Sequence, residues 1–282
     1  MINNKSFTLI ELLVVIVIIG ILAGVVMIST SSSIDKANIA KLKVFEESVQ
    51  NNLAANMVSR WSLDDGSGLT AKDIWGSNDG TLYNNPTWKN DNDCVSGGCL
   101  SFNGSNNYID CGTFGVIGSS FTFSAWFKTS SNQTYNPILM VDGNTNGNPQ
   151  LRTAGTGKVQ FRYYNGNSLE SFFSYNNNQW HHVIGGINNE GKYFLYVDGL
   201  SQETLMPNSI LNWTGNIKIG LYSYSTLSYF SGLIDDVRIY NAALSSAQIK
   251  QNYIAGLNSM LSNGTISKEE YNQRINALAY EK

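Results

Sequence analysis

The stretch Asp73-Ile-Trp-Gly-Ser-Asn-Asp-Gly80 gathers oxygen donors suited to a hard cation. Asp73, Asn78 and Asp79 supply carboxylate and amide oxygens, and the two glycines let the loop turn sharply enough to add backbone carbonyls. Calcium takes roughly 6–8 oxygen ligands at about 2.3–2.6 Å. Carboxylates clustered without a cation would repel one another. The pattern therefore predicts a structural calcium ion, and the alternative is that these aspartates cap turns and face solvent.

Residues typical of catalytic centres are present but not arranged for catalysis. The only two histidines, His181 and His182, are neighbours that would face opposite sides of a strand. The chain contains no H-E-x-x-H, G-x-S-x-G or P-loop motif. Glycosidases with a sandwich fold place two carboxylates roughly 5–9 Å apart on one face, usually at alternate positions of a strand. Asp64-Asp65 and Asp235-Asp236 are adjacent pairs and do not follow this pattern. We therefore predict that the protein is not an enzyme, with an anchored glycosidase as a remaining alternative.

The 3 cysteines lie close together in the sequence. Cys94-Val-Ser-Gly-Gly-Cys99 has a spacing that a cross-turn disulfide can span. Cys111 could instead pair with Cys99 across the next hairpin. Metal binding by the three is not expected, because no fourth ligand lies nearby. We favour the Cys94–Cys99 disulfide, which leaves one free thiol.

The N-terminal region contains an apolar run from Phe7 to Ile28 in which only Thr8 and Glu11 are polar. As a helix with a rise of about 1.5 Å per residue, this run is long enough to span a bilayer. An acidic residue in such a segment usually has a partner.

Charged residues make up only 14% of the chain, the net charge is −3 and no long basic block occurs, so we do not expect a nucleic-acid partner.

The sequence KSFTLIELLVVIVIIGILA closely resembles the start of type IV pilins and pseudopilins. The resemblance implies a prepilin leader over residues 1–6, which a prepilin peptidase removes between Ser6 and Phe7 before the new amino group is methylated. Glu11 of one subunit would then pair with the α-amino group of Phe7 in a neighbouring subunit during filament assembly. Ser6 replaces the glycine that this family usually has before the cut. The alternative is an uncleaved membrane anchor.

A second apolar stripe follows the membrane segment and favours a continued helix. Leu42, Phe45, Val49, Leu53 and Met57 recur every three or four residues, and no proline occurs between Phe7 and Arg60. We therefore predict one long helix over residues 7–60, with its transmembrane part at 7–28.

From Trp61 onward, short alternating runs separated by Gly- and Asn-rich turns predict a mainly β, antiparallel two-sheet sandwich. WSLDDGSG, CLSFNGSNNYID, FTFSAWFK, QWHHV, LYVDG and FSGLIDDVRIYNAALSSAQI occur in the order seen in laminin-G-like, concanavalin A-like jelly-roll domains. The resemblance covers residues 61–254 and implies a module that binds carbohydrate or protein, often with calcium. It also implies that the first and last strands lie together. That arrangement would bring Asp235 to Asp73, Asn78 and Asp79 as a fourth calcium ligand.

Residues 255–282 resemble a short helical hairpin appended to the domain. A serine-capped helix begins near Ser245, Gly264 is a helix stop, and Ser267-Lys-Glu-Glu270 is a capping-box sequence. Such an amphipathic pair more often mediates packing than chemistry.

These features together favour a minor pilin or pseudopilin that displays a laminin-G-like adhesion or lectin head on the cell surface. Its expected partners are other pilin subunits, the prepilin peptidase, the membrane and a glycan or surface-protein ligand. The alternative is a membrane-anchored lectin-like protein that does not polymerise. Aromatic residues in or beside loop-like sequence are candidates for stacking on sugar rings, although about half of them would be expected to fill the core: Tyr163, Tyr164, Trp213, Tyr222 and Tyr224.

Overall fold

The computed structural model describes residues 41, 44, 48, 53–143, 149–163, 168–205, 213–223 and 227–279. The predicted membrane span at residues 7–28 lies outside these residues. Among the helices that are described, none is both long and apolar enough to cross a membrane. Contacts divide the chain into two units, Met1–Phe45 and Glu46–Lys282, and all the strands belong to the second unit.

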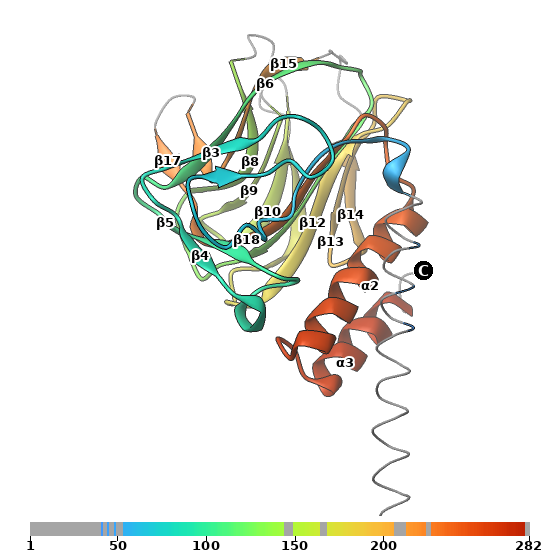
Figure 1. The fold of residues 1–282 in the computed structure, drawn as a ribbon. Helices are drawn as coiled ribbons and strands as arrows, with labels where there is room; N and C mark the ends of the chain where they lie inside the picture. Colours follow the sequence, from blue (N-terminus) through green and yellow to red (C-terminus); the bar gives the residue numbers. More distant parts are fainter. Residues whose placement is uncertain are drawn as a thin grey trace, which may run out of the picture. The chain divides into compact units, whose positions relative to one another are not determined.

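The described part of the second unit contains two large antiparallel sheets and a C-terminal pair of helices, as the sequence predicts (Figure 1). We call the first of these sheets sheet A. Its strands follow the order β14 (Leu200–Leu205), β13 (Tyr193–Val197), β12 (Trp180–Ile187), β7 (Phe121–Lys128), β18 (Ser231–Tyr240), β5 (Cys99–Asn103) and β4 (Thr87–Lys89), and β1 (Met57–Trp61) also pairs with β18.

The second large sheet, sheet B, is also antiparallel. Its order is β11 (Ser168–Ser174), β10 (Lys158–Arg162), β9 (Gln150–Ala154), β8 (Tyr135–Asp142), β15 (Trp213–Ile219), β6 (Tyr108–Ile117), β3 (Gly80–Tyr83) and β2 (Thr70–Ala71). A small two-stranded sheet, β16 (Leu221–Tyr222) and β17 (Ser228–Tyr229), contacts β8. A 3₁₀ turn, η1, covers Asp91–Asp93.

Alternating apolar residues from both sheets form one core. On β7, Phe121, Phe123, Ala125 and Phe127 point into this core, while the residues between them point outward. Period-2 alternation places every second side chain on the same face of a strand. This explains why short alternating segments of the sequence predict a sandwich.

The first and last strands of the domain lie together, as expected. β1 pairs antiparallel with β18, with Trp61 opposite Val237. This pairing also corrects the helix predicted for residues 7–60, because the chain leaves helical conformation after Ala54 and β1 starts at Met57. Met57, Ser59 and Trp61 are buried in alternation. The same Met57 fits the helical stripe and the strand, and pairing with β18 decides between them.

Two C-terminal helices, α2 (Ser246–Asn263) and α3 (Lys268–Ala279), form the predicted hairpin. Ser245 and Gln248 make a capping box, and Gly264 ends α2 with a left-handed φ of 81°. The Ser267 hydroxyl accepts from the Glu270 N–H at 3.1 Å. The hairpin starts earlier than the predicted boundary at residue 255, which falls inside α2.

The hairpin covers the outer face of sheet A (Figure 1). Tyr253 of α2 stacks on Trp126 of β7, with ring centroids 5.6 Å apart. A Cβ on Gly256 would lie 2.2 Å from Trp126, so α2 approaches the indole more closely than any larger residue would allow. Arg274 of α3 donates to the Trp180 carbonyl at 2.7 Å. The helices are therefore packed as part of the domain.

Candidate functional site

The residues predicted to act in processing and assembly, Ser6, Phe7 and Glu11, lie outside the described residues. The predicted disulfide is confirmed. Cys94 and Cys99 are bonded with their Cα atoms 5.5 Å apart, and Cys111 is a buried free cysteine. The alternative pairing of Cys99 with Cys111 is therefore wrong.

Asp73 organises its own loop through backbone hydrogen bonds. Its Oδ1 accepts from the N–H groups of Arg60 and Gly76 at 2.9 and 2.8 Å, and its Oδ2 accepts from the Asn78 N–H at 3.1 Å. Asp79 accepts in turn from the Asp73 N–H at 2.9 Å. Burial alone would raise the pKa of Asp73, but these N–H donors outweigh it and lower the pKa. Asp73 therefore caps its turn, as the alternative above describes, but it is buried and does not face solvent.

Asp235 belongs to a different part of the fold. Its Oδ2 accepts from Val95 N–H at 2.8 Å and Ser96 N–H at 3.3 Å, so it holds the disulfide loop Cys94–Cys99 against β18. Its other oxygen, Oδ1, is buried without a hydrogen-bond partner. Burial, together with the charges of Asp236 and Asp64, raises the pKa of Asp235 well above its usual value.

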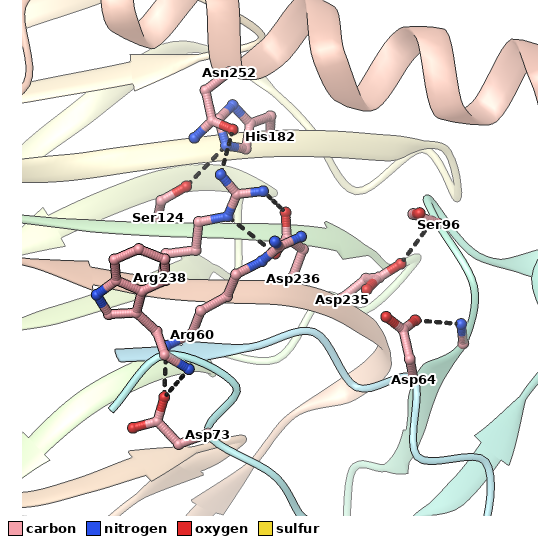
Figure 2. Close-up of polar contacts among 12 residues, drawn as sticks. Arg60, Asp64, Asp73, Ser96, Ser124, His182, Asp235, Asp236, Arg238 and Asn252 are labelled. Atoms are coloured by element: carbon pink, nitrogen blue, oxygen red, sulfur yellow. Dashed lines mark hydrogen bonds and ion pairs between the residues drawn. The ribbon is translucent and has the colours of Figure 1, made fainter. Parts of the chain in front are cut away.

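The structure therefore does not bring the four predicted calcium ligands together. Figure 2 shows the Asp73 and Asp235 carboxyl groups apart, with the Arg60 side chain drawn between them. Asp73, Asn78 and Asp79 stay together, but the Asp73 oxygens are already occupied by N–H donors. Among the described residues, no group of three or more His, Cys, Asp or Glu side chains is suited to a metal. The predicted set does not fit a calcium ion.

A buried ion-pair network lies beside Asp235 (Figure 2). Asp236 accepts from Arg60 Nε at 2.8 Å and from Arg238 Nε at 3.0 Å, and Arg238 Nη1 donates to Asn252 of α2 at 3.1 Å. Burial opposes ionisation of Asp236, but the two arginines hold its pKa well below the usual range. We call Arg60, Asp236, Arg238 and Asn252 the seam network, because it joins β1, β18 and α2.

A β-bulge explains how Asp235 reaches the disulfide loop while its neighbour Asp236 reaches the seam network. The register between β18 and β7 shifts between Asp235 and Arg238, and Asp236 has a left-handed φ of 45°. A bulge inserts an extra residue, so neighbouring side chains need not alternate across the sheet. Neighbouring residues of a regular strand would face opposite sides of the sheet, and the bulge removes this constraint from Asp235 and Asp236.

The two histidines make separate structural contacts. His181 Nδ1 bonds to Asp198 at 2.7 Å, while His182 Nε2 bonds to Ser124 at 2.9 Å. Burial and the charge of Arg238 lower the pKa of His182 to about 3, so this imidazole is neutral at physiological pH. It stacks on Trp126, under the hairpin, with ring centroids 4.9 Å apart.

The outer face of sheet B has a different chemistry. On β8, Leu139 and Val141 point into the core, so Met140 between them points outward. The other strands of sheet B alternate in the same way. The strand register aligns one row of outward residues across the whole sheet: Ser168, Arg162, Gln150, Met140, Lys218, Asp110, Thr81 and Thr70. A parallel row contains Glu170, Gln160 and Arg152.

Aromatic side chains flank these rows. Tyr135 stacks on Tyr222, with ring centroids 5.0 Å apart and planes at 11°. The Arg152 guanidinium lies over Tyr135, 4.5 Å from the ring centroid. On the other side, Tyr83 stacks on Tyr108 at 4.6 Å. We call the polar rows and these four tyrosines the sheet B face.

Sequence reasoning identified only one residue of the sheet B face. Of the aromatic candidates, Tyr222 lies there and Tyr163 is buried in the core, while Tyr164, Tyr224 and the side chain of Trp213 are outside the described structure. Arg152 and Tyr135 were missed. The alternation in Gln150-Leu-Arg-Thr-Ala154 signals an outward arginine, but nothing local reveals which residues lie beside it.

Comparisons with known solved structures show the same fold. Domain 4 of AbnA, an extracellular GH43 arabinanase from Geobacillus stearothermophilus solved with arabinotriose, matches with a TM-score of 0.57 at 17% identity, over 70% of this chain and 98% of that one. The binding domain of Paraclostridial mosquitocidal protein 1 matches with a TM-score of 0.57 at 16% identity, over 73% and 53%. Trypanosoma rangeli sialidase matches with a TM-score of 0.56 at 16% identity, over 76% of this chain but only 38% of the sialidase.

Sequence comparisons identify two families. No curated protein sequence matches the chain. The prokaryotic N-terminal methylation motif matches residues 1–27. The profile described as the concanavalin A-like lectin/glucanases superfamily matches residues 103–250, more than half of the 282 residues. The chain therefore belongs to the concanavalin A-like lectin/glucanase superfamily, and it begins with a prokaryotic N-terminal methylation motif of the type IV pilin kind.

Proposed function

We propose that this protein is a minor pilin or pseudopilin that displays a glycan-binding head outside the membrane. The observation that carries the proposal is the presence of both families in one chain, the methylation motif at residues 1–27 and the lectin-like domain at residues 103–250. A methylation motif implies membrane anchoring and surface exposure, which would present the domain to external ligands.

The apolar N-terminal segment supplies a physical reason for assembly. Removal of residues 1–6 creates a positive α-amino group at Phe7, and Glu11 carries the only negative charge of the apolar run. Each charge is costly in the membrane by itself, so pairing between subunits sets the register of the filament. The membrane, a prepilin peptidase and other pilin subunits are the partners that this step requires.

Intact mass spectrometry of the mature protein tests processing. We expect the loss of residues 1–6 and the gain of one methyl group. A retained leader would instead favour the membrane-anchored lectin that does not polymerise, which Ser6 in place of the usual glycine also favours.

Replacing Glu11 by valine tests assembly. We expect Glu11→Val to insert normally, because the segment becomes more apolar, but to be depleted from sheared surface filaments relative to total membrane protein. Equal incorporation of wild-type and variant chains would contradict the assembly role.

A binding role suits the sheet B face better than hydrolysis does. The two carboxylates of its aligned rows are both ion-paired, Asp110 with Lys218 at 2.6 Å and Glu170 with Lys158 at 3.1 Å. They stand on β6 and β11, with four strands between them, which corresponds to about 24 Å at a strand spacing of about 4.8 Å. Paired glycosidase carboxylates lie within about 10 Å. Release of sugar from a panel of polysaccharides, abolished by Asp110→Asn or Glu170→Gln, would contradict a purely binding role.

Glycans are the ligand class that we favour for the head. The aromatic and polar side chains of the sheet B face suit sugar rings and hydroxyl groups, and one solved structure of similar fold contains arabinotriose. Screening the full-length chain in detergent micelles against a glycan array tests this. Absence of binding to every glycan would favour a protein ligand instead.

A further inference from the structure

Arg152 is a nearly buried cation on the sheet B face, with 5% of its surface exposed. Its Nε donates to Gln160 at 2.8 Å and its Nη1 donates to Gln150 at 3.5 Å, so both acceptors are neutral amides. Within the described part of the chain, no carboxylate pairs with it. Arginine stays protonated in proteins, and buried charges are normally paired. The guanidinium therefore lacks the anion that such a position usually requires.

Two other cations of this face differ from Arg152 because each has a carboxylate partner. Lys158 and Lys218 are both paired, with Glu170 and Asp110. Arg162, next to Gln150 in the aligned row, has no ion pair among the described residues and adds to the uncompensated charge. Burial, followed by repulsion from Arg162, lowers the pKa of Arg152, as expected for two neighbouring cations.

The loops that lie outside the described residues also contain no anion for Arg152. The four segments of the head that lie outside the described residues, 144–148, 164–167, 206–212 and 224–226, contain no aspartate or glutamate. These loops therefore cannot supply the counter-charge. The two acidic residues of the head whose side chains are not described, Asp91 and Glu203, belong to η1 and to β14 of sheet A.

One nitrogen of Arg152 is left for a ligand. Its Nη2 has no acceptor within the described structure, and 5% of the surface of the residue is exposed. The stacked rings of Tyr135 and Tyr222 lie directly beside the guanidinium. A planar guanidinium binds a carboxylate through two parallel hydrogen bonds.

We propose that the sheet B face binds an acidic polysaccharide, with Arg152 and Arg162 binding the carboxylate of a uronic acid unit. Tyr135 holds the guanidinium of Arg152 through the cation–π contact, and Gln150 and Gln160 orient it. This inference rests on the proposed glycan-binding function. It adds the charge of the ligand and the residues that bind the charged group.

Binding of polygalacturonate to the full-length chain in detergent micelles tests the proposal. Its methyl ester, which has the same sugar backbone without the negative charge, is the matched neutral probe. We expect polygalacturonate to bind about tenfold or more tightly than the ester, since hydrogen bonds to charged groups are worth about that factor or more. Arg152→Gln and Arg162→Gln should each reduce polygalacturonate binding about tenfold and leave binding of the ester unchanged.

Lys192→Gln is the matched control, because it removes the same charge from an exposed ion pair outside this face. It should leave polygalacturonate binding unchanged. Arg162 is more exposed than Arg152, so its variant should stay folded even where replacement of Arg152 does not. Equal binding of the two probes, or full binding by folded Arg162→Gln, would overturn the inference. If either variant still binds neutral glycans, the proposed glycan-binding function stands. If the wild-type chain binds no glycan at all, both the proposed function and this inference are wrong.

Discussion

The outer faces of the two sheets differ in whether their buried cations have an anionic partner. On sheet A, α2 covers the face, and Asp236 lies between Arg60 and Arg238, so a cation–anion–cation group is buried with its anion in place. On sheet B, Arg152 is nearly as buried, but its neighbours are Gln150, Gln160 and Tyr135. A covered face needs internal compensation because no outside group can reach it. The outer face of sheet B is covered only in part, by β16 and β17 against β8, and an uncompensated cation there is a position where a ligand can supply the anion.

Removing the anion of the seam network should have the largest effect on stability. Asp236→Ala leaves Arg60 and Arg238 buried without a partner, and we expect a loss of about 3–5 kcal/mol in the free energy of unfolding. Urea denaturation followed by tryptophan fluorescence measures this. Glu190→Ala, which breaks an exposed pair with Lys192, is the control and should leave the urea midpoint nearly unchanged. Comparable losses from the two variants would contradict the contrast between the faces.

Blocking the approach of the hairpin should have the next largest effect. Gly256→Leu places a side chain where a Cβ alone would lie 2.2 Å from Trp126, and we expect a loss of about 1–3 kcal/mol from overpacking. Ala247→Leu, at an exposed position in the first turn of α2, is the control and should be nearly neutral. If Gly256→Leu unfolds at the same urea concentration as wild type, the hairpin does not pack on sheet A as described.

Asp235 should give the protein a pH-dependent stability. The folded state raises the pKa of Asp235 above its unfolded value of about 3.9, so its contribution is complete below that value and is lost as the pH rises toward the folded pKa. Asp235→Asn keeps an oxygen for Val95 and Ser96 and cannot ionise. We expect the stability of the variant relative to wild type to increase between pH 4 and pH 8, as measured by urea midpoints at each pH. A difference that does not vary with pH would show that Asp235 titrates normally.

The sheet B face should show the smallest effect on stability. Arg162→Gln removes a half-buried charge without an ion pair in the described structure, so we expect a change within about 0.5 kcal/mol. Thermal melting without ligand measures it. A loss as large as that of Asp236→Ala would mean that this arginine has a structural role, and the two faces would then treat charge in the same way.

Local sequence was sufficient for the features that depend on neighbouring residues. The strands of the sandwich follow from alternation, because a half-buried strand needs an apolar residue at every second position. The Cys94–Cys99 bond follows from a short loop, and the caps of α2 from Ser245, Gln248 and Gly264. The methylation motif was also readable directly, because its residues are consecutive.

Only the tertiary structure decided the features that depend on strand register. Met57 fits both a helical stripe and a strand, and pairing with β18 selects the strand. The bulge at Asp236 directs Asp235 to the disulfide loop and Asp236 to two arginines, which separates Asp235 from Asp73. Arg152 becomes a candidate ligand-binding residue only through Gln150, Gln160 and Tyr135, and whether a charge is compensated depends on which strands lie beside it in the sheet.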